Sequence, residues 1–81
     1  MDEKKSNKEE LLSISRAAKQ AGISKQTLQY YLMVGLLEAS GRTKSGAQLF
    51  DHKAIERIQL IKKLNDSGYP LREIREIFLH K

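Results

Sequence analysis

The chain contains no cysteine and no tryptophan, and it has one proline and 6% aromatic residues. Without cysteine there is no disulfide framework, thiolate metal site or cysteine nucleophile, which fits a reducing, cytoplasmic setting. The longest apolar run, LMVGLL at residues 32–37, is far shorter than the roughly 20 residues that a membrane-spanning helix needs. The first ten residues, MDEKKSNKEE, lack the apolar stretch of a signal peptide. These absences predict a soluble, cytoplasmic protein with no membrane partner.

Charge is distributed unevenly along the 81 residues, a length that suits one small domain with a modest core. Residues 1–10 carry three lysines against four acids, whereas residues 11–81 carry twelve basic groups against six acidic ones. Between residues 11 and 50 the only acid is Glu38, and the basic residues are Arg16, Lys19, Lys25, Arg42 and Lys44. This half is expected to face a polyanion such as nucleic acid, with a merely solvated surface as the other interpretation.

Two short helices are expected at residues 14–21 and 25–33. Ser13 and Ser24 stand directly before the two apolar-periodic stretches, in positions where a serine hydroxyl can cap the first backbone N–H groups. Gly22 lies between them and can adopt the left-handed conformation that ends a helix. Two short helices joined by a tight, glycine-containing turn are typical of a helix-turn-helix motif.

The rest of the chain predicts a β-hairpin and two further helices. Residues 41–51, GRTKSGAQLFD, place two glycines around a basic turn before an alternating stretch, as in a small wing. Asp51 can cap a long helix that stops at residues 67–68, and Pro70 fits the first turn of a last helix. That last helix is expected to bury one face made of Leu71, Ile74, Ile77 and Phe78. Residues 1–10 are expected to be a disordered tail before a domain at residues 11–81.

The second helix has one side that suits DNA. At 100° per residue, its core side is expected to hold Ser24, Leu28, Tyr31, Leu32 and Gly35. Its free side holds Gln26, Gln29, Tyr30 and Met33. Glutamine can pair with the N6 and N7 edge of adenine, and Lys25 and Thr27 can reach phosphate or bases from the helix N-terminus. The same residue types also occur on ordinary solvent-facing helices, and Tyr30 either contacts DNA or folds back over a neighbour.

Three stretches together resemble the N-terminal DNA-binding domain of MerR-type transcriptional regulators. They are GISKQTLQYY followed by GLL, GRTKSG followed by an alternating strand, and LNDSGYPLREI, and the match covers about residues 13–79. The resemblance implies a mainly α, winged helix-turn-helix fold of four helices and a small two-stranded β wing. It implies that the second helix enters the major groove of double-stranded promoter or operator DNA and that the wing lies against the backbone. The implied contacts are Ser24, Lys25, Thr27, Gln29 and Tyr30 on the helix, and Arg42, Thr43, Lys44 and Ser45 on the wing.

The chain departs from the family pattern at several of these positions. Gln29 and Gln48 stand where the family usually has arginine, so we expect weaker binding or compensation by Arg16, Lys25 and Lys44. Leu32 replaces a usual acid and Met33 adds apolar area, which indicates a protein contact patch if the helix phase is right. Family members continue into a dimerisation helix and often an effector domain, whereas this sequence stops at Lys81. We therefore expect a monomer on one half-site, and a dimer only if a longer protein supplies that helix.

Two other functions stay open. A protein-interaction module on the same fold would bind a regulatory protein or RNA polymerase through the recognition surface or the edge at Leu32 and Met33. An excisionase-like architectural DNA-binding protein would also be short and winged. An enzyme is not expected, because no acid, base or nucleophile groups converge and the two histidines lie far apart in sequence. No cofactor and no metal site are expected.

Overall fold

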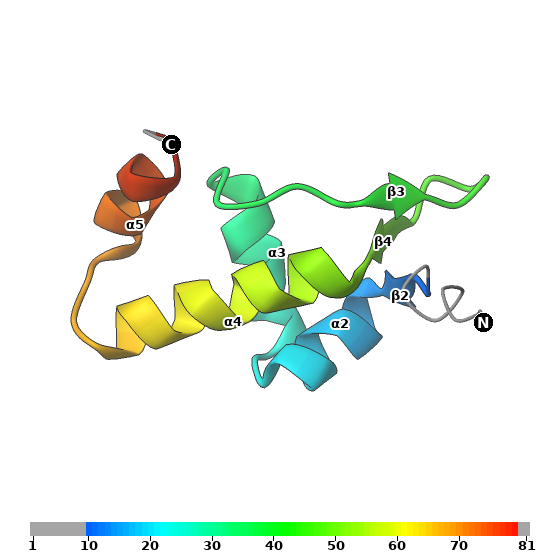
Figure 1. Ribbon diagram of the computed structural model, residues 1–81. Coiled ribbons are helices and arrows are strands. Elements are labelled where there is room, and N and C mark those ends of the chain that lie inside the picture. Colours follow the sequence, from blue (N-terminus) through cyan, green and yellow to red (C-terminus); the bar gives the residue numbers. More distant parts are fainter. Residues whose placement is uncertain (1–9, 80–81) are drawn as a thin grey trace, which may run out of the picture.

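The computed structural model describes residues 10–79 and contains four helices and one small antiparallel sheet (Figure 1). The elements in chain order are β2 (Leu12–Ser13), α2 (Ile14–Ala21), α3 (Lys25–Met33), β3 (Gly41–Arg42), β4 (Gln48–Phe50), α4 (His52–Asp66) and α5 (Leu71–Leu79). The predicted mainly α fold with four helices and a wing is confirmed. Apart from Glu10, the predicted disordered tail lies outside the described residues.

The caps of α2 and α3 are those expected from the sequence. The Ser13 hydroxyl accepts a hydrogen bond from the Arg16 N–H at 3.3 Å, and the Ser24 hydroxyl accepts one from the Thr27 N–H at 3.0 Å. Gly22 has φ +83° and ends α2 in the left-handed conformation. Because these signals are local, they fix both helix starts and the turn between the helices without help from distant residues.

The two helices of the motif pack closely because the contact is made by small side chains. Ala17, Ala18 and Ala21 of α2 are buried, as are Leu28 and Tyr31 of α3. Alanine adds little bulk between helix backbones, so the larger α3 side chains fill the space that remains. The predicted core side of α3 is confirmed at these two positions, whereas Leu32 is half-buried and the prediction is wrong at Ser24 and Gly35, which are exposed because they lie at the two ends of the helix.

The wing is part of a three-stranded sheet with strand order β2-β4-β3, rather than a two-stranded hairpin alone. β4 pairs antiparallel with both neighbours, so that Leu12 lies opposite Phe50 and Gly41 lies opposite Leu49. The sequence interpretation missed β2, because two residues are too few to show an alternating pattern. The added strand attaches the hairpin to the segment that leads into α2.

The long helix α4 begins where Asp51 accepts a hydrogen bond from the Ala54 N–H at 2.9 Å. The apolar stripe of α4 packs with residues from α2, α3 and α5 in one core. The large side chains that are fully buried in this core are Leu28, Leu36, Phe50, Ile58, Ile61 and Ile74. α5 begins at Leu71, directly after Pro70, and Ile77 is 49% exposed rather than part of the buried face. On α5, Ile74 is therefore the fully buried residue of the predicted face.

Substitution of two glycines separates backbone strain from side-chain crowding. Gly22 and Gly35 have nearly the same φ, +83° and +84°, but only at Gly35 would a Cβ meet a neighbour, Arg75 Nε at 3.1 Å. We expect Gly22→Ala and Gly35→Ala each to lower the free energy of unfolding by about 1–2 kcal/mol, because left-handed backbone disfavours a Cβ. Urea denaturation of both variants would show a similar loss if the Arg75 side chain moves aside, and a much larger loss for Gly35→Ala if it does not.

Candidate nucleic-acid interface

The structure brings the predicted α3 residues together on the exposed side of that helix. Lys25, Gln26 and Gln29 are exposed, Thr27 is half-buried, and Tyr30 is 46% exposed. No acidic residue occurs in α3, so these five residues comprise one cation and four uncharged polar or aromatic groups. Polar donors and acceptors with a single positive charge suit a surface that reads base edges between phosphates.

The first turn of α3 is held by a pair of hydroxyl groups. The Ser24 hydroxyl accepts from the Thr27 N–H and donates to Thr27 Oγ1 at 2.8 Å. These two side chains therefore bind each other and shape the N-terminus, whereas the N–H groups of Lys25 and Gln26 precede the first intrahelical bond and point outward. Together with the positive end of the helix dipole and the Lys25 ammonium, they form a surface that attracts an anion.

The turn of the wing is closed by bonds among its own residues. The Thr43 N–H donates to the Ala47 carbonyl at 2.9 Å, and the Thr43 and Ser45 hydroxyls lie 3.0 Å apart. The Arg42 guanidinium donates to the Gly46 carbonyl at 3.3 Å, and Lys44 is exposed at the tip. Because one guanidinium nitrogen is used in this bond and the others face solvent, Arg42 keeps donors for an external partner.

The cations predicted to contact DNA have no acidic partner in the described part of the chain. Among residues 10–79, carboxylates contact basic side chains at two places, Glu56 with His52 and Asp66 with Lys62, both within α4. Arg16 on α2 is exposed, as are the predicted cations of α3 and the wing. No acid among residues 10–79 neutralises their charge, which is therefore available to a polyanion as far as the described residues are concerned.

Tyr31 lies on the core side of the same helix, where α3 faces α4. Burial raises the pKa of its hydroxyl above the usual value, and the nearby carboxylate of Asp66 raises it further, while Lys62 lowers it. The hydroxyl therefore stays protonated and uncharged at neutral pH. Tyr31 positions α3 without adding a negative charge beside the candidate interface.

The two residues of the predicted protein contact patch lie in different environments. Met33 is 75% exposed at the end of α3, whereas Leu32 is half-buried and packs against the core. Leu32 therefore contributes mainly to the fold. Met33 alone supplies exposed apolar surface at this edge.

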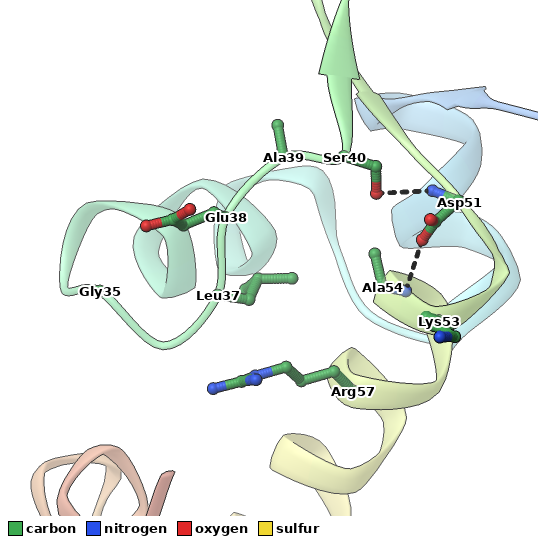
Figure 2. Close-up of a pocket in the computed structure, with 9 residues that line it drawn as sticks. All are labelled: Gly35, Leu37, Glu38, Ala39, Ser40, Asp51, Lys53, Ala54 and Arg57. Atoms are coloured by element: carbon green, nitrogen blue, oxygen red, sulfur yellow. Dashed lines mark hydrogen bonds between the residues drawn. The ribbon is translucent and has the colours of Figure 1, made fainter. Parts of the chain in front are cut away.

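A cavity of about 520 Å³ lies beyond the C-terminal end of α3, between residues 35–40 and the start of α4 (Figure 2). The Ser40 hydroxyl accepts a hydrogen bond from the Asp51 N–H at 2.9 Å, which joins the base of the hairpin to the N-terminus of α4. The hydrogen bond from the Ala54 N–H lowers the pKa of the Asp51 carboxyl; burial opposes this shift, and the Ser40 hydroxyl adds to it. Because acids and bases both line this cavity, it has no single charge to attract DNA; the lining residues are Gly35, Leu37, Glu38, Ala39, Ser40, Asp51, Lys53, Ala54 and Arg57.

A second cavity, of about 280 Å³, lies between α3 and α5 and includes the predicted residue Tyr30. Two of its lining residues, Arg72 and Arg75, were not predicted as part of the interface. The local sequence indicates only that Arg72 and Arg75 lie three residues apart, so that the two side chains are neighbours on the surface of a helix. Their proximity to Tyr30 depends on how α5 packs, which the sequence pattern does not reveal.

Two further findings concern membrane spans and metal sites among the described residues. No helix formed within residues 10–79 is long and apolar enough to cross a membrane. Over the same residues, no three histidine, aspartate or glutamate side chains gather in a group that could hold a metal ion.

Comparison with known proteins identifies the family. Residues 12–81 match the family model described as MerR HTH family regulatory protein. The nodulation protein NolA of Bradyrhizobium elkanii is 36% identical over 63 residues, which are 78% of this chain and 29% of NolA.

Solved structures with the same fold are also similar in sequence. A crystal structure of HiNmlR, a MerR family regulator lacking the sensor domain and bound to promoter DNA, has a TM-score of 0.77 at 31% identity. The match covers 84% of this chain and 54% of the HiNmlR chain. The N-terminus of the Bacillus subtilis multidrug transporter activator, MtaN, has a TM-score of 0.77 at 32% identity, with coverage of 82% and 62%. The chain thus spans between about three and six tenths of the length of these relatives, and it belongs to the MerR HTH family.

Proposed function

We propose that this chain binds double-stranded DNA and regulates transcription in the cytoplasm, acting by binding rather than by catalysis. The observation that carries the proposal is the acid-free outward side of α3, with Lys25, Gln26 and Gln29 exposed and no described carboxylate paired with the surrounding cations. HiNmlR, which has the same fold, was crystallised on promoter DNA. That likeness supports a promoter or operator half-site as the partner.

In this arrangement α3 enters the major groove and the wing lies along the backbone. The N-terminus of α3 and Lys25 hold a phosphate, while the amides of Gln26 and Gln29 face base edges. The exposed Arg42 and Lys44 contact phosphates beside the groove. Ser24 acts through the shape of the helix start, because its hydroxyl is bonded to Thr27.

Backbone amide shifts during titration with a DNA duplex at low salt test this function. Shifts at residues 24–30 and 42–48 are expected if α3 and the wing both contact DNA. An absence of shifts would contradict DNA binding, and shifts confined to residues 32–36 would favour a second candidate. That candidate is a protein-interaction module that binds a regulatory protein or RNA polymerase, and the 75% exposure of Met33 is the observation that favours it.

Substitutions on α3 are expected to separate phosphate contacts from base contacts. Lys25→Ala should weaken binding about tenfold on every duplex and reduce the slope of log affinity against log salt by about 0.9. Gln26→Ala and Gln29→Ala should instead change which base is preferred, by about 1–3 kcal/mol at one position of the site. Fluorescence anisotropy against a panel of single-base duplex variants measures both effects.

Lys53→Ala is the matched control for the lysine substitution. Lys53 is exposed on α4 and lines the cavity beyond the C-terminal end of α3, so its loss removes the same charge outside the proposed interface. Equal effects of Lys25→Ala and Lys53→Ala would show that only net charge matters. Equal effects of the glutamine substitutions on all duplexes would contradict base recognition by those amides.

A further inference from the structure

Arg57 of α4 connects three parts of the fold. Its Nε–H donates to the Leu36 carbonyl at 3.0 Å, and its guanidinium carbon lies 4.2 Å from the centre of the Phe78 ring. Leu36 follows α3 and Phe78 belongs to α5, so one side chain on α4 contacts both of the other segments. A planar guanidinium can make both contacts at once, because its N–H donors lie in its plane while its face covers the ring.

The Leu36 carbonyl is connected closely to the last turn of α3. The Leu36 N–H donates to the Tyr31 carbonyl at 3.0 Å, and the Gly35 N–H donates to the Leu32 carbonyl at 3.2 Å. The Leu36 side chain is fully buried in the core. Because these bonds continue from the helix into the turn, a displacement of the Leu36 carbonyl also displaces the C-terminal end of α3.

The rest of α3 is held mainly by α2. The backbones of these two helices lie close together, whereas the α3 backbone makes few close approaches to α4 or α5. Within residues 10–79, the Arg57–Leu36 bond joins positions 21 residues apart, a longer separation than in the other side-chain hydrogen bonds. The turn at residues 22–24 attaches the N-terminal end of α3 to α2, and Arg57 restrains the opposite end.

Arg57 lies in surroundings that do not suit a phosphate. It lines the cavity beyond the C-terminal end of α3 together with the acids Glu38 and Asp51. Figure 2 shows its side chain extending from α4 beside the segment that carries Leu37 and Glu38. Because two carboxyl groups share this lining, the cavity does not offer the purely positive surroundings that favour an anion.

We propose that Arg57 is a positioning residue for base recognition, which acts through α3 and does not touch DNA. Its bond to the Leu36 carbonyl and its contact with the Phe78 ring together fix the direction of α3. That direction decides how Gln26 and Gln29 meet the base edges. The proposal rests on the proposed function, because it requires that these glutamines read DNA. Hydrogen bonds weaken steeply with misalignment, so a small tilt of α3 affects base contacts more than charge contacts with phosphates.

Two substitutions of Arg57 test this role. Arg57→Lys and Arg57→Gln both remove the planar group, so each should reduce discrimination between the preferred duplex and its single-base variants roughly tenfold. The slope of log affinity against log salt should stay unchanged in both, even though Arg57→Gln removes a charge. Partial unfolding lowers the affinity for every duplex by the same factor. The ratio of affinities, measured by fluorescence anisotropy, therefore reports positioning and not stability.

Phe78→Leu provides an independent variant, since it removes the ring and keeps an apolar side chain on α5. It should reduce discrimination in the same direction as Arg57→Lys, by a smaller factor. The double variant should lose no more than Arg57→Lys alone, because both changes act through one guanidinium. Lys53→Arg is the matched control: it exchanges one cation for another on α4, in the lining of the same cavity, and should change neither quantity.

The outcomes separate this proposal from the function on which it rests. If the wild-type chain binds no duplex, the proposed function fails, and if it binds every duplex equally, base recognition by α3 fails; either result leaves no role for Arg57. If the wild type discriminates and the Arg57 variants discriminate equally well, the positioning role alone is overturned. A slope reduced by about 0.9 in Arg57→Gln would instead show that Arg57 contacts a phosphate. Thermal unfolding checks each variant, and Phe78→Leu decides the question if the Arg57 variants do not fold.

Discussion

Phe50→Ala is expected to lower the free energy of unfolding by about 3–5 kcal/mol. The Phe50 side chain is fully buried, and its strand, β4, pairs with both β2 and β3. Truncation leaves a cavity at the point where the sheet meets the helices, and small domains have only about 5–15 kcal/mol of stability in total. Urea denaturation followed by circular dichroism measures the change.

Leu60→Ala is the control for this substitution. Leu60 belongs to α4 but is 45% exposed, so its truncation removes little buried surface and should cost less than about 1 kcal/mol. If the two variants lost equal stability, Phe50 would not hold the sheet to the core. A stable Phe50→Ala protein that still bound DNA fully would mean that the wing is positioned by the strand pairing alone.

Salt is expected to have the second large effect, this time on DNA binding. If Arg16, Lys25, Arg42 and Lys44 each neutralise one phosphate, the slope of log affinity against log salt is about −3.6. Raising salt from about 50 to about 200 mM then weakens binding roughly 150-fold.

Anisotropy titrations on one duplex over this salt range measure the slope directly. A value near about −3.6 supports the four contacts. A slope close to zero would contradict the polyanion partner altogether, since counterion release accompanies every phosphate contact. The glutamines should not alter the slope, because they carry no charge.

Much of the helix-turn-helix could be predicted because its signals are local. α2 and α3 have the bounds expected from the caps at Ser13 and Ser24 and from the left-handed Gly22. β2 was missed because Leu12 finds its partner at Phe50, far along the chain, and two residues carry no periodicity. Ile77 was assigned to the buried face by its spacing, but it is 49% exposed, whereas Ile74 is fully buried.

The candidate interface likewise has one part that the sequence predicts and another that it does not. Periodicity alone separates the outward Gln26 and Gln29 from the inward Leu28, because all three lie within one turn of a single helix. The cavity beside Tyr30 could not be predicted, since Arg72 and Arg75 reach it only after α5 has packed against α4. The contacts that determine this packing include the guanidinium of Arg57, which lies 4.2 Å from the centre of the Phe78 ring.

The buried alanines of α2 have a consequence for redesign. Ala17, Ala18 and Ala21 set the distance between α2 and α3, because a larger side chain at any of these buried positions would push the helices apart. The angle of α3 therefore does not depend on its outward side chains. Positions 26, 29, 30 and 33 of α3 are exposed and can be randomised together without repacking the core. A library at these four positions would therefore sample new binding preferences on an unchanged scaffold, with stability decoupled from selectivity.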